Sequence, residues 1–531
     1  MSTIRSTVHA ALHFAVPSVL LMSAVASPVA HARQPFPLPF PQPFMVPNSL
    51  VISSTTYDRT RGAVAALTVG TTLPSTDTAT TAAVAGNNYV QVWNNATVDA
   101  SFGVTSPILL TDVEPNSGRV LSTLRVPTDQ VVTSFSSKSE LGLHVAGSGP
   151  WSRLIFVGYA SPGVGALDVS NSDAVPGQDP TNPVTFAFGD SYAFARTIVT
   201  VDGRGQFTYT PTINYGGDNG RSALLAGNGL YYTVGNSNNG NAATFGASNG
   251  TSPDVTETTG LEVVKPIDAP WARVPVPAGD SAEVDPLLQY ALGKGGKLDK
   301  PGKDNNYRGV TEFGGALYFT KGSGSNGMDT VYTVSGLPTV AGAAATPISV
   351  VPGFPTDSAR VTNGDYTPFA VFFANATTMY VTDEGTGSSV DASTHAGLEK
   401  WSLVNGTWQL DYVLTQGLIG VVDSNLNGYD GPYPAVTTIG LRNLAGVVND
   451  DGTVTLWATT STSSASGDNG ADPNKVVRIT DRVSATTMTG DVSRETFTTI
   501  AGPTYGTAYR GVAYVCGAVD PRTGLCRAGR F

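Results

Sequence analysis

The chain has 531 residues, including 60 Gly and 35 Pro, and only 13% of its residues are charged, about half of the roughly 25% that is typical. Turn formers therefore outnumber good helix formers, which excludes a mainly helical protein. The net charge of −11 argues against nucleic acid as a partner, because an acidic surface repels the phosphate backbone.

Residues 1–32 have the pattern of a secretory signal peptide. Arg5 precedes an apolar stretch from Ala10 to Ala26, and the Ala-His-Ala tripeptide at 30–32 fits a small-x-small cleavage site. No other apolar run is long enough to span a bilayer. We therefore predict a secreted protein, extracellular or periplasmic, with no membrane segment in its mature chain.

A Pro-rich stretch follows at residues 33–47, with Pro at nearly every second position. Such a run predicts an extended polyproline linker, so we expect a single folded domain over 48–531. The two cysteines, Cys516 and Cys526, are close in sequence near the C-terminus. In the oxidising compartment that export implies, they are expected to form a disulfide that holds the C-terminal tail.

From residue 48 onward the chain repeats a unit of four short apolar strands, each bounded by Gly, Asn, Asp or Pro. The aromatic-rich second strands align with one another and begin at Ser49, Ser152, Asn228, Gly315, Thr377 and Thr453. The first strands align at Ser139, Arg221, Arg308, Pro368, Arg442 and Arg510. The third and fourth strands form hairpins, and in the second unit this hairpin is expected over GLEVVKPIDAPWARVPV from Gly260.

Six such units predict an all-β, six-bladed β-propeller. The chain starts with a second strand at Ser49 and ends with a first strand at Arg510, so the C-terminal strand is expected to complete the N-terminal blade. The alternatives are a β-helix and a two-sheet sandwich, although solenoid repeats are usually shorter and more regular. The strand pattern over Asn48 to Val515 resembles secreted bacterial six-bladed propellers of the broad NHL and gluconolactonase-like type. The resemblance implies a fold and a binding face but no reaction.

Long insertions are expected on the face where the first strands begin, and that face is where binding usually develops. Four of the first strands carry an arginine near this end: Arg221, Arg308, Arg442 and Arg510. Lys138 and Glu140 flank a fifth. One hypothesis is a cationic rim that binds a carboxylate, sulfate or phosphate, and the alternative is that these arginines join neighbouring blades through backbone carbonyls and nearby Asp side chains.

Acidic residues near the same face are candidates for catalysis or metal binding. Asp383 and Glu384 end one second strand, and only one of two consecutive strand side chains points to a given side. Glu140 and Asn443 are further candidates to hold a metal. The alternative is that the acidic pair flanks a turn in solvent.

The run from Asp423 to Gly431 resembles the start of a calcium loop, with alternating oxygen donors and Gly428 at the sixth position. Its candidate ligands are Asp423, Asn425, Asn427 and Asp430. Because Pro434 replaces the usual twelfth-position Glu, the alternative is an ordinary Asn/Gly loop. Calcium is the only cofactor that the sequence suggests.

Histidine is scarce, because only His144 and His395 follow the expected leader. A Ser-His-Asp triad or a multi-histidine zinc site therefore has almost no material. We expect His144 in the core and His395 in solvent. Three functions stay open for a monomer of this kind: binding of an anionic or glycan ligand, calcium-assisted hydrolysis of an anionic ester, lactone or phosphate, and a structural surface role.

Overall fold

The protein is described from a computed structural model that covers residues 43–56, 105–135, 137–161, 163–164, 195–215, 218–236, 259–277, 279–286, 305–324, 327–359, 365–386, 395–424, 427–428, 431–432, 435–464, 470, 472–504, 506–519 and 526–527. The chain divides into two units, Met1–Gln42 and Pro43–Phe531. The expected signal peptide lies outside the described residues, as does most of the Pro-rich stretch. In the part described, no helix is long and apolar enough to cross a membrane.

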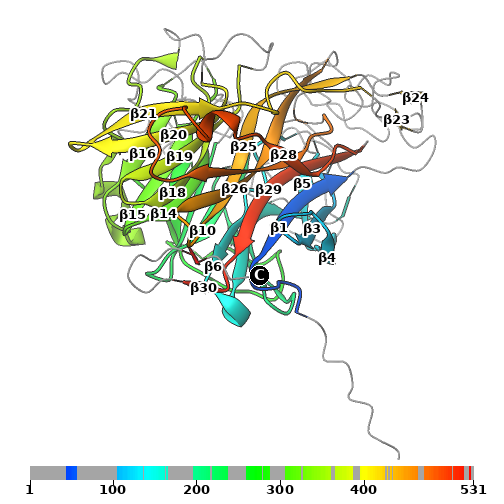
Figure 1. The fold of residues 1–531 in the computed structure, drawn as a ribbon. Coiled ribbons are helices and arrows are strands. Elements are labelled where there is room, and N and C mark those ends of the chain that lie inside the picture. The colour runs from blue at the N-terminus through cyan, green and yellow to red at the C-terminus, as the bar shows by residue number, and fades with distance from the viewer. Residues whose placement is uncertain are drawn as a thin grey trace, which may run out of the picture. The chain divides into compact units, whose positions relative to one another are not determined.

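Six sheets in the second unit form a six-bladed β-propeller, which confirms the predicted fold (Figure 1). We number the blades by their inner strands, each of which contacts the inner strands of both neighbouring blades around the ring. The inner strands of blades 1 to 6 are β6 (His144–Ala146), β10 (Gly220–Leu225), β14 (Tyr307–Phe313), β18 (Pro368–Asn375), β25 (Val436–Val448) and β29 (Thr507–Val515).

The remaining strands of each blade follow outward from the inner strand. Blades 1 to 3 add β7 (Arg153–Ala160), β8 (Arg196–Asp202) and β9 (Phe207–Thr212); β11 (Tyr231–Gly235), β12 (Gly260–Val264) and β13 (Ser281–Glu283); and β15 (Ala316–Lys321), β16 (Thr330–Val334) and β17 (Ile348–Val350). Blades 4 to 6 add β19 (Thr378–Asp383), β20 (Gly397–Val404) and β21 (Thr407–Leu414); β26 (Thr453–Ser464), β27 (Val476–Arg482) and β28 (Thr498–Ala501); and β1 (Ser49–Thr56), β3 (Ile108–Val113) and β4 (Val120–Arg125).

The shorter elements lie at the edges of this scheme. They are β2 (Thr105–Ser106), β5 (Val131–Ser134), β22 (Val422–Asp423), β23 (Asn427–Gly428), β24 (Gly431–Pro432), β30 (Ala518–Val519) and β31 (Cys526–Arg527), with 3-10 helices η1 (Gly149–Trp151), η5 (Val340–Ala345) and η6 (Val492–Arg494).

The second strands are apolar along their length because each blade is covered on both faces by its neighbours. Strand β11, with the sequence YYTVG, is buried at every position. A separate hydrophobic cluster fills the space between each pair of adjacent blades, six clusters in all for the described residues. Aromatic and β-branched side chains suit this flat, two-sided packing.

The ring closes where the sequence predicted that it would. Strand β29, from the C-terminal end, pairs antiparallel with β1, from the N-terminal end, over seven residue pairs that run from Ser49↔Val515 to Thr56↔Thr507. The predicted disulfide between Cys516 and Cys526 is present, directly after β29. Its second half lies in β31, which pairs with β25 of blade 5 at Val448.

Two strands differ from the prediction. The fourth strand of blade 2 is Ser281–Glu283, not the expected WARVPV segment. That segment is rich in Pro, which cannot donate to a β-ladder, and Ala269 just before it instead pairs with Tyr209 of blade 1. In blade 1 the inner position is split, because β5 and β6 both pair with β7, and residues 135–143 connect them.

Candidate functional site

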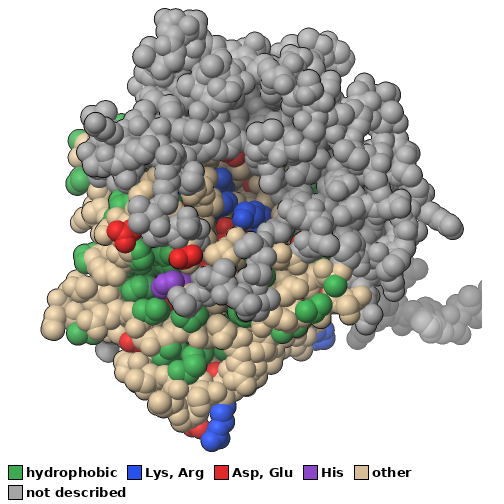
Figure 2. Space-filling view, turned by 90° about the horizontal axis from the view of Figure 1, so that it is seen from above, with side chains coloured by type: hydrophobic (Ala, Val, Ile, Leu, Met, Phe, Trp, Pro, Cys, Tyr) green, Lys and Arg blue, Asp and Glu red, His purple; other side chains and the backbone are tan. Residues whose placement is uncertain are grey.

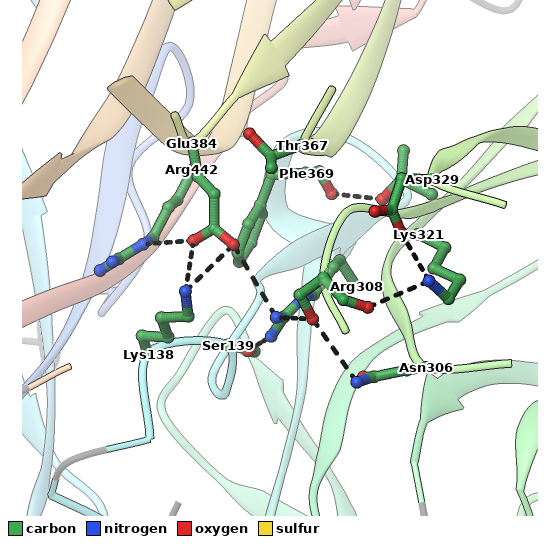
Figure 3. A network of polar contacts seen from close by, with 12 residues as sticks. Lys138, Ser139, Asn306, Arg308, Lys321, Asp329, Thr367, Phe369, Glu384 and Arg442 are labelled. Atoms are coloured by element: carbon green, nitrogen blue, oxygen red, sulfur yellow. Dashed lines mark hydrogen bonds and ion pairs between the residues drawn. The ribbon is translucent and has the colours of Figure 1, made fainter. Parts of the chain in front are cut away.

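The four predicted arginines are all buried and lie on inner strands, but they divide into two pairs with different contacts. Arg308 and Arg442 point to a shared carboxylate, Glu384, which follows β19 of blade 4 (Figure 3). Arg221 and Arg510 point to backbone carbonyls of other segments. Contacts of both kinds link neighbouring blades, and the anion-binding hypothesis stays a prediction.

Glu384 is the centre of the first group. Lys138 Nζ lies 3.1 Å from Glu384 Oε2, Arg442 Nε lies 3.2 Å from the same oxygen, and Arg308 Nη2 lies 3.8 Å from Oε1. We call Lys138, Arg308, Arg442 and Glu384 the central cluster. They come from the segment before β6 and from blades 3, 5 and 4, so the ring brings together positions that are as much as 304 residues apart in sequence.

The central cluster has three cations and one carboxylate, an excess of two positive charges among these four side chains. The Asp472 and Asp329 carboxylates also interact electrostatically with Arg442 and Arg308. Burial raises the pKa of Glu384, but the combined effect of Lys138, Arg308 and Arg442 is larger and lowers the pKa to about 2. Burial lowers the pKa of Lys138 to about 8, because the two arginines oppose its charge and Glu384 only partly compensates. The space-filling view from above shows Lys and Arg side chains in the hollowed centre of this face (Figure 2).

Further contacts hold Arg308 in place. Its guanidinium donates to the hydroxyl oxygens of Ser139 and Ser323 and lies 5.9 Å from the centre of the Phe369 ring. Asn306 also donates to Ser323, at 3.4 Å. The Arg308 Nε–H, however, has no hydrogen-bond partner in the described part of the chain.

Arg221 and Arg510 join blades, as the structural alternative predicted. Arg221 Nη1 donates to the Tyr307 carbonyl of blade 3 at 2.7 Å and to the Asn306 side chain. Arg510 Nη2 donates to the Gly470 carbonyl at 2.7 Å and to the Phe135 carbonyl. These carbonyl groups neutralise no charge, but they accept from the terminal Nη donors of each guanidinium.

Asp383 and Glu384 point to different surroundings, as expected for consecutive residues at a strand end. Asp383 accepts hydrogen bonds from the Thr367 backbone N–H and hydroxyl, both at 2.6 Å, and from the Gly385 N–H at 2.8 Å. Burial, with the Glu399 carboxylate nearby, raises the pKa of Asp383 to about 7. The pair is buried, so the alternative of a solvated acidic turn is wrong.

A histidine contact that the sequence analysis missed lies beside Asp383. His395 Nδ1 is 2.5 Å from Glu399 Oε1, and this hydrogen bond raises the pKa of His395. The expectation that His395 lies in solvent is wrong, since its side chain is only 25% exposed. No local sequence signal marks the pair, because Glu399 reads simply as one position of the strand GLEKWSLV. His144 bonds the Ser222 hydroxyl at 3.1 Å, and burial lowers the pKa of His144 to about 4.

Glu140 is buried and accepts hydrogen bonds from four donors. They are the Thr133 hydroxyl at 2.5 Å, the Ser134 N–H at 3.0 Å, the Asn219 amide at 2.9 Å and the Tyr159 phenol. Asn443 donates to the Arg510 carbonyl at 2.7 Å. These contacts give both residues a role in joining segments, and their suggested catalytic or metal-binding roles stay predictions.

The candidate calcium loop is described only in part. Asn425 and Asp430 lie outside the described residues, and Asn427 is described only as part of strand β23, which pairs with β24. Asp423 forms an ion pair with Lys475, at 2.9 Å. The described residues contain no group of three or more His, Cys, Asp or Glu side chains placed to hold a metal. Calcium binding stays a prediction.

No protein-family model and no curated protein matches the chain. Solved structures with a distant likeness include the GH43 β-xylosidase/α-arabinofuranosidase CoXyl43 from a compost microbial metagenome, at 10% identity, a TM-score of 0.28, and coverage of 58% of this chain and 83% of that one. The GH43_1 enzyme from Xanthomonas citri has 12% identity, a TM-score of 0.28 and coverage of 59% and 83%. A PL25 ulvan lyase has 10% identity, a TM-score of 0.28 and coverage of 78% and 92%.

Likenesses this distant place the chain in no family. Its class, a six-bladed β-propeller, follows from its own sheet order and closure. The resemblance to the NHL and gluconolactonase-like type stays a prediction.

Proposed function

We propose that this protein is an exported binding propeller whose central cluster takes the anionic group of an extracellular ligand. The excess of two positive charges around Glu384 carries the proposal. Arginine forks and a lysine amine are the groups that proteins use for carboxylate, sulfate and phosphate.

In this proposal Glu384 is an internal anion that pairs with the cations both before and after a ligand binds. Its carboxylate keeps three like charges together, which would otherwise repel one another in a partly desolvated site. A ligand anion then adds to the cluster and offsets the remaining charge. The leader and the disulfide support an oxidising, extracytoplasmic setting for this binding.

The test measures binding of sulfate, phosphate and small carboxylates to the whole mature chain by calorimetry. Arg308→Gln and Arg442→Gln should each weaken binding by about tenfold or more, because each removes a charge-assisted hydrogen bond. Arg204→Gln removes an exposed arginine from the β8–β9 turn and is the charge-matched control.

Glu384→Gln gives the sharper result, because the proposal expects it to tighten anion binding by removing the competing carboxylate. If the cluster only joined blades, Glu384→Gln would lower stability and leave anion binding undetectable. No measurable binding of any of the three anions by the wild-type chain would refute the proposal. The relative affinities for sulfate, phosphate and carboxylate then identify the ligand's anionic group.

A further inference from the structure

A groove of about 310 Å³ lies in the seam between blades 5 and 6, away from the central cluster. It is lined by the ends of β25, β26 and β27 and by the turn between β3 and β4. Val447 in its wall is five residues beyond Arg442 on β25, or roughly 16 Å along the strand. The groove is thus a separate site, and its role is independent of the proposed binding of an anion at the central cluster.

Two largely buried aromatic residues line one part of the groove, which we call its base. Trp457 of blade 5 and Tyr514 of blade 6 stack with their ring centres 5.3 Å apart and their planes within 13°. The Trp457 indole N–H donates to the Pro115 carbonyl at 2.7 Å, which fixes the ring against the β3–β4 turn. This pair gives the groove a rigid apolar base.

Polar groups of several kinds surround that base. Arg478, Asn449, Asn116 and Asp451 line the groove, together with threonine hydroxyls. Asn449 donates to the hydroxyl oxygens of Thr453 and Thr455, at 2.8 and 3.0 Å, so its amide is already oriented. Guanidinium, amide, hydroxyl and carboxylate groups together offer both donors and acceptors within one small space.

Arg478 has a buried donor that no described residue uses. Its Nη2 donates to the Thr480 hydroxyl at 3.3 Å, but its Nε–H has no hydrogen-bond partner in the described residues. A buried donor without an acceptor is costly, and the guanidinium that carries it lines the groove.

The charges around the groove balance, which argues against a strongly charged ligand. Its lining contains one cation, Arg478, and one carboxylate, Asp451. These two charges leave no net charge in the lining. The volume is at the lower end of the range for small-molecule sites, roughly 300–1,000 Å³.

We propose that this groove is a second ligand site and that it binds a neutral saccharide unit. A sugar ring has an apolar face for the aromatic base and alternating hydroxyl groups that both donate and accept. One ring hydroxyl would bond to the Arg478 guanidinium, while others bond to Asn449, Asn116 and Asp451. The groove thereby recognises one sugar unit, free or at the end of a longer glycan.

The experiment uses saturation-transfer NMR on the whole mature chain with the methyl glycosides of glucose, galactose, mannose and xylose. Sodium acetate and cyclohexanol serve as comparison probes for a carboxylate and for an apolar ring. We expect transfer to at least one glycoside. Binding of none of the four, or binding of cyclohexanol as strong as that of the best glycoside, would overturn the proposal.

Variants locate the binding. Arg478→Gln and Arg478→Lys should each weaken glycoside binding by about tenfold, because both remove the guanidinium group, although the lysine keeps the charge. Arg482→Gln, an equal charge change four residues further along β27, should leave the affinity within about twofold. An equal loss in Arg482→Gln would mean that general charge, not the groove, is responsible.

Two further outcomes separate the groove from other sites. If acetate competes with the glycoside and its binding also depends on Arg478, the groove binds a carboxylate. That result would overturn the saccharide proposal. Arg308→Gln should leave glycoside binding unchanged, and a loss there would place the saccharide at the central cluster instead. Melting curves of all variants confirm that each is folded.

Discussion

Lys138 is the residue of the central cluster whose charge depends most on its surroundings. Burial and the two nearby arginines lower its pKa to about 8, and Glu384, which raises the pKa, compensates only in part. The sequence showed a lysine before a short strand and could not show that two arginines from distant blades approach it. The pKa shift is thus a property of the assembled ring.

This lowered pKa predicts that sulfate binding depends on pH. Between pH 7 and 9.5 the Lys138 amine loses its proton, so affinity should fall by roughly three- to tenfold, while sulfate itself keeps its charge. Lys138→Met should bind more weakly at pH 7 and show little change with pH. Calorimetry at several pH values checks this, and a flat wild-type profile would contradict it.

The same shift has an opposite sign for stability. Between pH 8 and about 10.4 the unfolded chain keeps a proton on Lys138 that the folded chain has lost. The contribution of Lys138 to the free energy of unfolding therefore rises with pH across this window. As pH rises, sulfate binding should thus weaken while stability increases. A ligand site would show both changes, and a purely structural cluster would show only the change in stability.

At the scale of elements, a Ser or Thr hydroxyl on the second strand of four blades donates to a backbone carbonyl on, or just before, the inner strand of the next blade. The hydroxyl groups of Ser53, Thr320, Thr382 and Thr459 donate to the carbonyls of Leu141, Phe369, Arg442 and Arg510. Each of these residues stands at the same place in the aligned second strands. A recurring Ser or Thr at that place was a signal in the sequence, but only the structure shows that it joins neighbouring blades.

Two of these contacts depend on a glycine, because only a residue without a side chain lets the two backbones approach closely. A Cβ atom on Gly511 would collide with the Leu141 carbonyl oxygen, and one on Gly309 would lie only 2.6 Å from the carbonyl oxygen of Phe369. Both glycines follow an arginine, so Arg-Gly at the start of an inner strand combines a long side chain with a close backbone approach. Neither glycine tolerates a side chain without separating two blades.

We predict that Ser53→Ala and Thr320→Val each lower the free energy of unfolding by about 1–3 kcal/mol. Ser53 Oγ accepts from the Gly511 N–H at 2.7 Å and donates to Leu141 O at 3.0 Å, so its removal leaves two buried groups without this partner. Thr320 makes the equivalent pair of contacts with Gly309 and Phe369. Urea unfolding measures the change.

Thr407→Val, at an exposed position that begins β21, is the control and should change stability by less than about 0.5 kcal/mol. If all three variants lose the same stability, the hydroxyl contacts between blades are not the cause.

At the scale of the whole molecule, the ring depends on the pairing of its two ends. Strands β1 and β29 are more than 450 residues apart and yet form one sheet. The disulfide adds a covalent tie at this point, because Cys516 follows β29 of blade 6 and Cys526 lies in β31, which pairs with blade 5. It therefore restrains the tail across the seam beside the closure.

Replacing both cysteines with serine should leave the fold intact but lower the free energy of unfolding by about 3 kcal/mol, as expected for the 10-residue separation. Reduction of the wild-type chain should give the same loss in a denaturant titration. An unchanged unfolding midpoint after complete reduction would show that β29 and β1 hold the closure without the disulfide.

The sequence by itself determined the repeat, the six blades, the order of strands and the closure, because strand composition and turn residues are local properties that repeat with each blade. It also nominated the residues that form the central cluster. It could not separate Arg308 and Arg442 from Arg221 and Arg510, because all four open the aligned first strands in the sequence.

Only the tertiary structure decided which side chains meet. Glu384 gathers three cations from three other parts of the ring, and Trp457 and Tyr514 from two blades form one groove. Neither arrangement has a local signature, since each depends on how adjacent blades pack and how far a side chain reaches across the seam. Local pattern specifies the blade, and packing between blades specifies the sites.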